Sequence, residues 1–145
     1  MSDRTFADSN VLIYAVEIGG EETDKAAIAR ALIERTRPCL STQVLGEFYN
    51  AVTSARRRDP MTHEEAVEWI AKWLRLEVRP VTTAHVELAL DLRKRFQVSY
   101  YDALILAAAR LAECPAVYSE DLNNGQNYGG VTAINPFAPL QQNRP

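Results

Sequence analysis

The sequence has few of the residues that cross-link, anchor or export a small protein. Its two cysteines, Cys39 and Cys114, stand apart, with no CxxC pair and no histidine nearby. This isolation argues against a thiolate metal site and predicts two buried thiols in a reducing cytoplasm. No apolar run reaches the roughly 18 residues of a transmembrane helix, and no signal peptide is recognisable, so we expect a cytoplasmic protein without membrane contact.

Positive charge is also scarce. The chain has 16 lysines and arginines against 19 aspartates and glutamates, which gives a net charge of −3. Proteins that bind nucleic acid without sequence preference are usually basic, so this balance argues against a binder of that kind. It does not argue against a nuclease, because an acidic active site becomes electropositive once metal ions fill it.

The length of 145 residues predicts a single domain, 1–145, with 138–145 as a loose tail. Short apolar strands alternate with helical patterns, which predicts an α/β fold with a central, mostly parallel five-stranded sheet flanked by helices on both faces. The expected strands are 4–8, 38–40, 76–79, 116–118 and 131–134. The expected helices are 11–15, 23–35, 42–57, 62–74, 83–96 and 99–113.

The most informative stretch is the helix from Ala103 to Leu111, which is nearly apolar all round and therefore belongs in a core. Asp102 stands at its entrance, and a carboxylate is costly to bury unless it is paired, hydrogen-bonded or bound to a metal. Three other acids stand at similar borders between apolar and polar sequence, namely Asp8, Glu47 and Asp121.

The expected topology brings these acids together. Asp8 ends the first strand and Asp121 lies just past the fourth, so a parallel sheet places both at its carboxyl edge, where ligands bind. Glu47 lies about two turns into the helix after the second strand, and Asp102 lies in the first turn of the helix that leads into the fourth. We therefore predict one site built from four carboxylates.

Each acid taken alone has an ordinary explanation. Asp8 and Asp102 can cap helices, Glu47 can be solvated in mid-helix, and Asp121 can be a plain loop residue. Glu120 competes with Asp121 for a ligand role, and the sequence does not decide between them. The ordered set, with every member at the edge of an element, argues for function.

The chemistry of such a set is that of a hard-oxygen site. Four carboxylates without clustered histidine or cysteine suit Mg²⁺ or Mn²⁺. Without metal the acids repel one another, and at least one pKa is expected to be raised. These ions activate water and stabilise charge on a phosphoryl group, which indicates phosphodiester hydrolysis. Ser9, Asn10 and Ser119 are candidate donors that orient the carboxylates.

With these residues, the chain resembles PIN-domain ribonucleases, and most of all the VapC-type toxins of bacterial toxin–antitoxin pairs. The resemblance covers essentially the whole chain and rests on residues 6–14, 41–48, 101–108, 118–126 and 134–137. It implies a single PIN-like domain that cleaves RNA with Mg²⁺ or Mn²⁺ held by Asp8, Glu47, Asp102 and Asp121, with Asn10 and Ser119 in support. It also implies a homodimer and a cognate antitoxin as inhibitor.

Two other functions compete with this interpretation. An aspartyl-phosphate enzyme would use Asp8 as its nucleophile, but such enzymes typically need a second acid two residues on, and Asn10 fills that place. A non-catalytic module that dimerises and holds a partner would tolerate loss of the acids, and all four are present.

The remaining motifs are basic runs and a tryptophan pair. Arg56–Arg58 and Arg93–Arg95 each end an expected helix, where they suit the helix dipole or contact RNA phosphates. The helix at 62–74 opens with a capping box and places Val67, Ile70 and Leu74 on one face. Trp69 and Trp73 of this helix are expected in the core or in an antitoxin groove rather than stacked on bases. We assign no catalytic role to His63 or His85.

Overall fold

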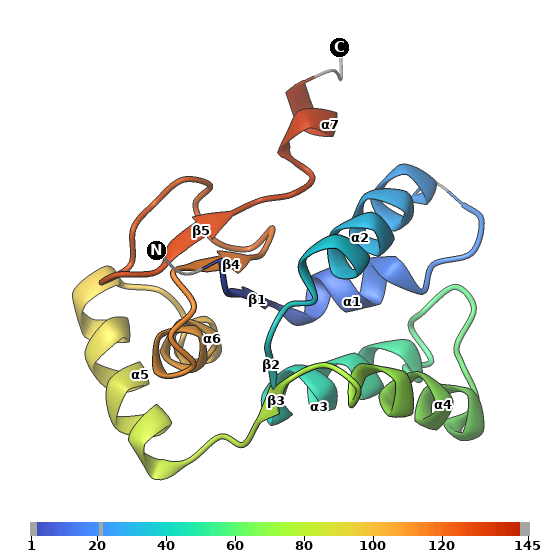
Figure 1. The fold of residues 1–145 in the computed structure, drawn as a ribbon. Coiled ribbons are helices and arrows are strands. Elements are labelled where there is room, and N and C mark those ends of the chain that lie inside the picture. Colours follow the sequence, from blue (N-terminus) through green and yellow to red (C-terminus); the bar gives the residue numbers. More distant parts are fainter. Residues whose placement is uncertain (1–2, 21, 143–145) are drawn as a thin grey trace.

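Three short parallel strands form the centre of the computed structural model, which describes residues 3–20 and 22–142 (Figure 1). The strands β1 (Thr5–Ala7), β4 (Ala116–Tyr118) and β5 (Thr132–Ile134) pair in the order β1-β4-β5. Phe6 lies opposite Val117, and Val117 lies opposite Ala133. All three of these side chains are fully buried, so the middle of the sheet lies in the core.

The other two strands form a sheet of their own. β2 (Leu40–Ser41) and β3 (Val78–Arg79) pair in parallel, so the five predicted strands exist but the main sheet has three. A single parallel bridge between Phe6 and Cys39 joins the two sheets within the described residues. Strands of two residues are too short to continue the ladder, which explains why the predicted five-stranded sheet is divided.

The helices cover both faces of the three-stranded sheet. Figure 1 shows α1 (Ser9–Ala15) and α2 (Thr23–Thr36) on one side and α5 (Thr83–Phe96) and α6 (Tyr100–Leu111) on the other. Helices α3 (Thr42–Val52) and α4 (His63–Trp73) pack together beside the β2–β3 sheet. None of the helices described here is long and apolar enough to cross a membrane.

The chain ends in a short helix that the sequence did not lead us to expect. Helix α7 (Ala138–Gln142) occupies most of the segment predicted as a loose tail. Residues 143–145 lie outside the described residues. The division of the chain into one domain with a loose tail therefore stays a prediction.

Helix α6 is the buried central helix that the sequence predicts. All seven residues from Ala103 to Ala109 are buried. Ser99 caps the helix, since its hydroxyl accepts a hydrogen bond from the backbone N–H of Asp102 at 3.2 Å. The cap fixes the first turn of α6, and with it the position of Asp102.

One expectation about a helix was wrong. Helix α3 ends at Val52 and not near Arg57, because the Arg57 side chain folds back to the Val52 carbonyl (3.5 Å) and pairs with Glu17 at 3.1 Å.

The buried face of α4 is defined by a tryptophan, whereas Val67 and Leu74 are 45% and 57% exposed. Trp73 is 6% exposed, and its ring meets Phe48 edge-on with centroids 5.8 Å apart. An indole buries more apolar area than the side chain of Val or Leu. The burial of Trp73 therefore determines which face of α4 packs against α3. Ala66, which lies on the same side, is fully buried.

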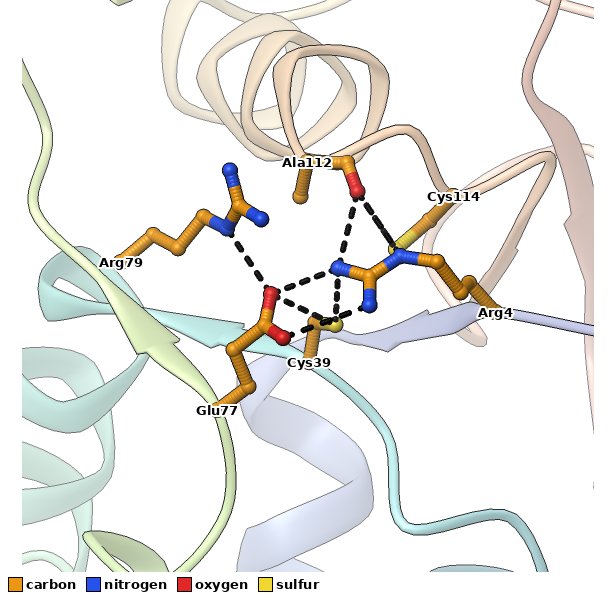
Figure 2. Close-up of polar contacts among 6 residues, drawn as sticks. All are labelled: Arg4, Cys39, Glu77, Arg79, Ala112 and Cys114. Carbon is orange, nitrogen blue, oxygen red and sulfur yellow. Dashed lines mark hydrogen bonds and ion pairs between the residues drawn. The ribbon is translucent and has the colours of Figure 1, made fainter.

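A clasp around Arg4 ties the beginnings of the strands together at the edge opposite their carboxyl ends (Figure 2). The Arg4 guanidinium donates to Glu77 Oε2 (2.6 Å), Cys39 Sγ (3.2 Å) and the Ala112 carbonyl (3.0 Å). Glu77 also accepts from Arg79 Nε at 2.8 Å. These hydrogen bonds lower the pKa of Glu77 to about 2. The carboxylate therefore stays charged near neutral pH and keeps its ion pair with Arg4.

The two cysteines lie in this clasp as free, buried thiols, as predicted. Cys39 Sγ donates a hydrogen bond to Glu77 Oε2 at 3.4 Å, and Cys114 Sγ donates to the Ala112 carbonyl at 3.7 Å. Burial raises the pKa of Cys114 to about 12, and a thiol that keeps its proton is a poor nucleophile.

Because the seven residues of α6 that follow Asp102 are all buried, a cavity in this helix should destabilise the whole fold. Leu106→Ala removes a side chain that is 0% exposed and is expected to lower the free energy of unfolding by about 2–5 kcal/mol. Urea unfolding followed by circular dichroism measures the change. Leu111→Ala, at a position 39% exposed on the same helix, is the matched control. Equal losses in both variants would contradict the central position of α6.

Candidate metal centre

Asp8 lies at the junction of β1 and α1 and is 4% exposed. Its Oδ1 accepts from the backbone N–H of Ser9 at 2.7 Å, and its Oδ2 accepts from the Ser119 hydroxyl at 2.7 Å. The first bond makes Asp8 the cap of α1. The second ties it to the end of β4. The capping explanation and the site explanation therefore both apply to the same side chain.

Three of the four predicted acids converge. Carboxylate oxygens of Asp8, Asp102 and Asp121 all lie within 4.8 Å of one another. The first comes from the end of β1, the second from the first turn of α6 and the third from the loop after β4. They become neighbours because parallel strands deliver their carboxyl ends to one edge of the sheet. An ion coordinated by oxygens about 2.1–2.5 Å away fits between carboxylates at this spacing.

Glu47 stands at the wall of this cluster rather than within it. It projects from α3 and is half-buried, and its Oε2 accepts from Gln43 Nε2 at 3.4 Å. Its Oε1 is buried without any hydrogen-bond partner among the described residues. A buried carboxylate oxygen without a donor is costly, and a cation would satisfy it.

Asn10 and Ser119 both form hydrogen bonds with the acids of the cluster. The Asn10 amide nitrogen lies 3.2 Å from Asp121 Oδ2 and 3.5 Å from Asp8 Oδ2. The Ser119 hydroxyl accepts from the backbone N–H of Asp121 at 3.1 Å while it donates to Asp8. Both side chains therefore connect two acids of the cluster.

Glu120 turns away from the cluster. It accepts hydrogen bonds from the Tyr14 hydroxyl and from Lys25 Nζ, the latter at 3.1 Å. Lys25 also lies over the Tyr14 ring, 4.7 Å from its centroid. Of the two adjacent acids, Asp121 faces Asp8 and Asp102, while Glu120 is neutralised by a lysine.

Sequence reasoning missed this network of Tyr14, Lys25 and Glu120. Lys25 is distant in sequence from Glu120, and its ammonium group reaches it only because α2 packs against α1. No local pattern in the sequence indicates this pairing, because Glu120 and Asp121 lie in a bend after β4 and not on a strand.

The electrostatics of the pocket are those of acids crowded without a counter-charge. Burial raises the pKa of Asp8 to about 7, against the hydrogen bonds from Ser119 and Ser9, and the charges of Glu47 and Asp121 add to the rise. Burial likewise raises the pKa of Glu47 and of Asp102, with nearby carboxylates adding to both. A divalent cation would remove this cost because it favours the charged form of every ligand.

Comparison with known proteins gives one family and a set of similar folds. Residues 5–125 match the family model described as the PIN domain. No curated protein matches the sequence. A toxin–antitoxin complex from Klebsiella pneumoniae is similar with a TM-score of 0.65 and 16% identity, covering 92% of this chain and 97% of the other.

Two further solved structures show the same fold. VapC20 of Mycobacterium tuberculosis, described as a toxin that cleaves the sarcin–ricin loop, has a TM-score of 0.64 and 24% identity, covering 82% of this chain and 91% of its own. FitAcB from Neisseria gonorrhoeae has a TM-score of 0.63 and 16% identity, covering 92% and 98%.

The raised pKa of Asp8 predicts that the metal-free protein loses stability as the pH rises. The folded state keeps the Asp8 proton up to about pH 7, whereas the unfolded chain releases it near the ordinary value of 3.8. Folding therefore takes up a proton between these values, and the free energy of unfolding falls across that window. Glu47 and Asp102 act in the same direction.

Thermal melts of metal-free protein between about pH 4 and pH 8 measure this effect. Asp8→Asn should flatten the fall, and excess Mg²⁺ should raise the melting temperature more at the alkaline end than at the acidic end. Asp91→Asn, at an exposed acid on α5, is the control and should leave the slope unchanged. A slope that is the same with and without the Asp8 carboxylate would contradict the assignment of the raised pKa.

Proposed function

The chain belongs to the PIN domain family, and from this premise we propose that it is a Mg²⁺- or Mn²⁺-dependent endoribonuclease, the toxin of a cytoplasmic toxin–antitoxin pair. The observation that carries the nuclease proposal is the convergence of Asp8, Asp102 and Asp121 beside a buried, unpartnered oxygen of Glu47. An all-carboxylate set prefers hard cations of this kind.

The proposed chemistry divides into what the ion supplies and what the chain supplies. A bound divalent ion supplies activation of water and stabilisation of negative charge on the phosphoryl group. Asp8, Asp102 and Asp121 would hold it, with Glu47 as a fourth ligand from α3. Ser119 and Asn10 keep the carboxylates of Asp8 and Asp121 oriented, so that little reorganisation is needed when the substrate binds.

The alternatives fit the geometry less well. For an aspartyl-phosphate enzyme, the residue two places after Asp8 would have to act as an acid, and Asn10 instead donates to the carboxylates. A non-catalytic partner-binding module gives no reason to keep four acids at one edge, where burial and neighbouring carboxylates raise the pKa of Asp8 and of Glu47. The RNA substrate is supported by the fold of VapC20, which is described as cleaving an RNA loop.

An antitoxin partner is supported by similar folds described as toxin–antitoxin complexes and by an apolar pocket on this chain. The pocket lies between α1, α2 and α4 and is lined by Ala15, Ile33, Trp69 and Trp73, with Arg30 and Glu34 at its rim. The two indoles stack with centroids 5.5 Å apart. We propose that an apolar segment of the antitoxin packs here. We also propose a homodimer, for which exposed Val86 and Leu90 on α5 offer an apolar face.

The nuclease proposal predicts RNA cleavage by the purified chain that needs Mg²⁺ or Mn²⁺ and stops on addition of EDTA. Asp102→Asn and Asp8→Ala should each reduce the rate by more than about 100-fold, because even residues behind metal ligands contribute about 10–100-fold. Gel analysis of total RNA gives the readout. Asp91→Asn, an exposed acid outside the site, is the control and should cut at the wild-type rate. Cleavage that survives both EDTA and Asp102→Asn would contradict the four-acid mechanism.

The partner proposal predicts a stable complex with the small protein encoded beside this chain's gene. Trp69→Glu places a charge in the apolar pocket and should weaken the complex by at least about 10-fold, since an unpaired buried charge is costly at an interface. Co-purification and titration calorimetry measure this. Leu74→Ser, at an exposed position at the end of the same helix, should leave the affinity unchanged. Equal affinity of both variants would place the partner elsewhere.

A further inference from the structure

Gln43 connects two parts of the acidic site that different sheets carry. It lies in the first turn of α3, the helix that follows β2 and carries Glu47. Its Nε2 donates to Glu47 Oε2 at 3.4 Å and to the backbone carbonyl of Tyr101 at 3.2 Å. Tyr101 directly precedes Asp102 in the first turn of α6. One side-chain amide therefore contacts the carboxylate from α3 and the helical turn that carries one of the three converging acids.

The partners of this amide determine which way it faces. A glutamine amide has an oxygen that accepts hydrogen bonds and a nitrogen whose two hydrogens donate them. An ionised carboxylate and a backbone carbonyl can only accept, so the nitrogen is the atom that must face them. In the opposite orientation the Gln43 oxygen would stand against two other oxygens, and both hydrogen bonds would be lost.

This orientation leaves the Gln43 oxygen without a donor. Its Oε1 is buried and has no hydrogen-bond partner within the part of the chain that the structure describes. A buried acceptor without a donor costs free energy, and a rotamer that pointed into solvent would avoid that cost. The two hydrogen bonds of the nitrogen therefore hold the side chain where it is.

Glu47 needs a contact of this kind because its side chain is long and comes from a helix that the three-stranded sheet does not carry. A glutamate side chain has several rotatable bonds, and each rotamer is accessible unless a neighbour restrains it. The hydrogen bond from Gln43 engages Oε2 and leaves Oε1 buried without a donor. Such a carboxylate is restrained through one oxygen while the other remains available to a cation.

We propose that Gln43 is a positioning residue, which orients the Glu47 carboxylate toward the first turn of α6 so that Glu47 completes the ligand set of the three converging acids. The proposal rests on the nuclease function proposed above, because it concerns the metal site of that function. Gln43 acts through Glu47, in the same way that Ser119 donates to Asp8.

A double-mutant cycle on metal affinity tests this role. Gln43→Met keeps the length of the side chain and removes both N–H groups. Mn²⁺ is titrated calorimetrically into the metal-free wild type, Gln43→Met, Glu47→Gln and the double variant. Gln43→Met should weaken Mn²⁺ binding about 10- to 100-fold, as the loss of an orienting donor does in other metal sites. The double variant should bind no more weakly than Glu47→Gln alone, because no ionised carboxylate is left to orient.

The controls separate positioning from folding. Asn50→Met removes an exposed amide about two turns further along α3 and should bind Mn²⁺ as the wild type does. Gln43→Ala removes the same donors with a strong helix former and should show the same loss of affinity as Gln43→Met. Thermal melts of the metal-free variants should match that of the wild type. Melting temperatures that fall together with the affinity would make Gln43 a structural residue and overturn the proposal.

The remaining outcomes distinguish the positioning role from the nuclease function. Wild-type affinity in Gln43→Met or in Glu47→Gln would overturn the positioning role and leave metal-dependent cleavage standing. Losses in the single variants that multiply in the double variant would also overturn it, because Gln43 would then act independently of Glu47. A wild type that binds no Mn²⁺ and shows no metal-dependent RNA cleavage would overturn both proposals.

Discussion

Mutual repulsion among carboxylates that share a poorly solvated pocket is the constraint on which the rest of the molecule depends. Asp8 is nearly inaccessible to solvent, and its pKa rises because burial disfavours its charge and two other acids stand close. Ser119 and Asn10 offset part of this cost because they donate hydrogen bonds to the acids. Asp102 stands in the first turn of α6, directly before seven buried residues.

The opposite edge of the sheet shows the complementary arrangement. There a single arginine, Arg4, connects Glu77, Cys39 and the end of α6, and the charges attract rather than repel (Figure 2). Attraction at the amino edge lowers the pKa of Glu77, while crowding at the carboxyl edge raises that of Asp8. At the amino edge of the sheet, the negative charge of Glu77 is neutralised by arginine side chains. At the carboxyl edge, the clustered acids leave an excess of negative charge that suits a cation.

The sequence was sufficient for the parts of this arrangement that local chemistry determines. The buried run of α6, the capping box at Thr62 and the approach of Asp8 to Asp121 follow from apolar patterning, cap residues and the direction of parallel strands. The roles of the four acids as ligands stay predictions.

What the sequence did not predict depends on packing between distant segments. The main sheet is divided because β2 and β3 have only two residues each, and α3 ends at Val52, where Arg57 pairs with the distant Glu17. The pairing of Glu120 with Lys25 is of the same kind. Because α3 follows β2, the two-stranded sheet carries Glu47, while the three-stranded sheet and α6 carry the other acids. Within residues 3–20 and 22–142, the bridge between Phe6 and Cys39 and the Arg4 clasp join the two sheets, and this junction sets the distance of Glu47 from the trio. The spacing within the trio is set separately, by the three-stranded sheet and α6.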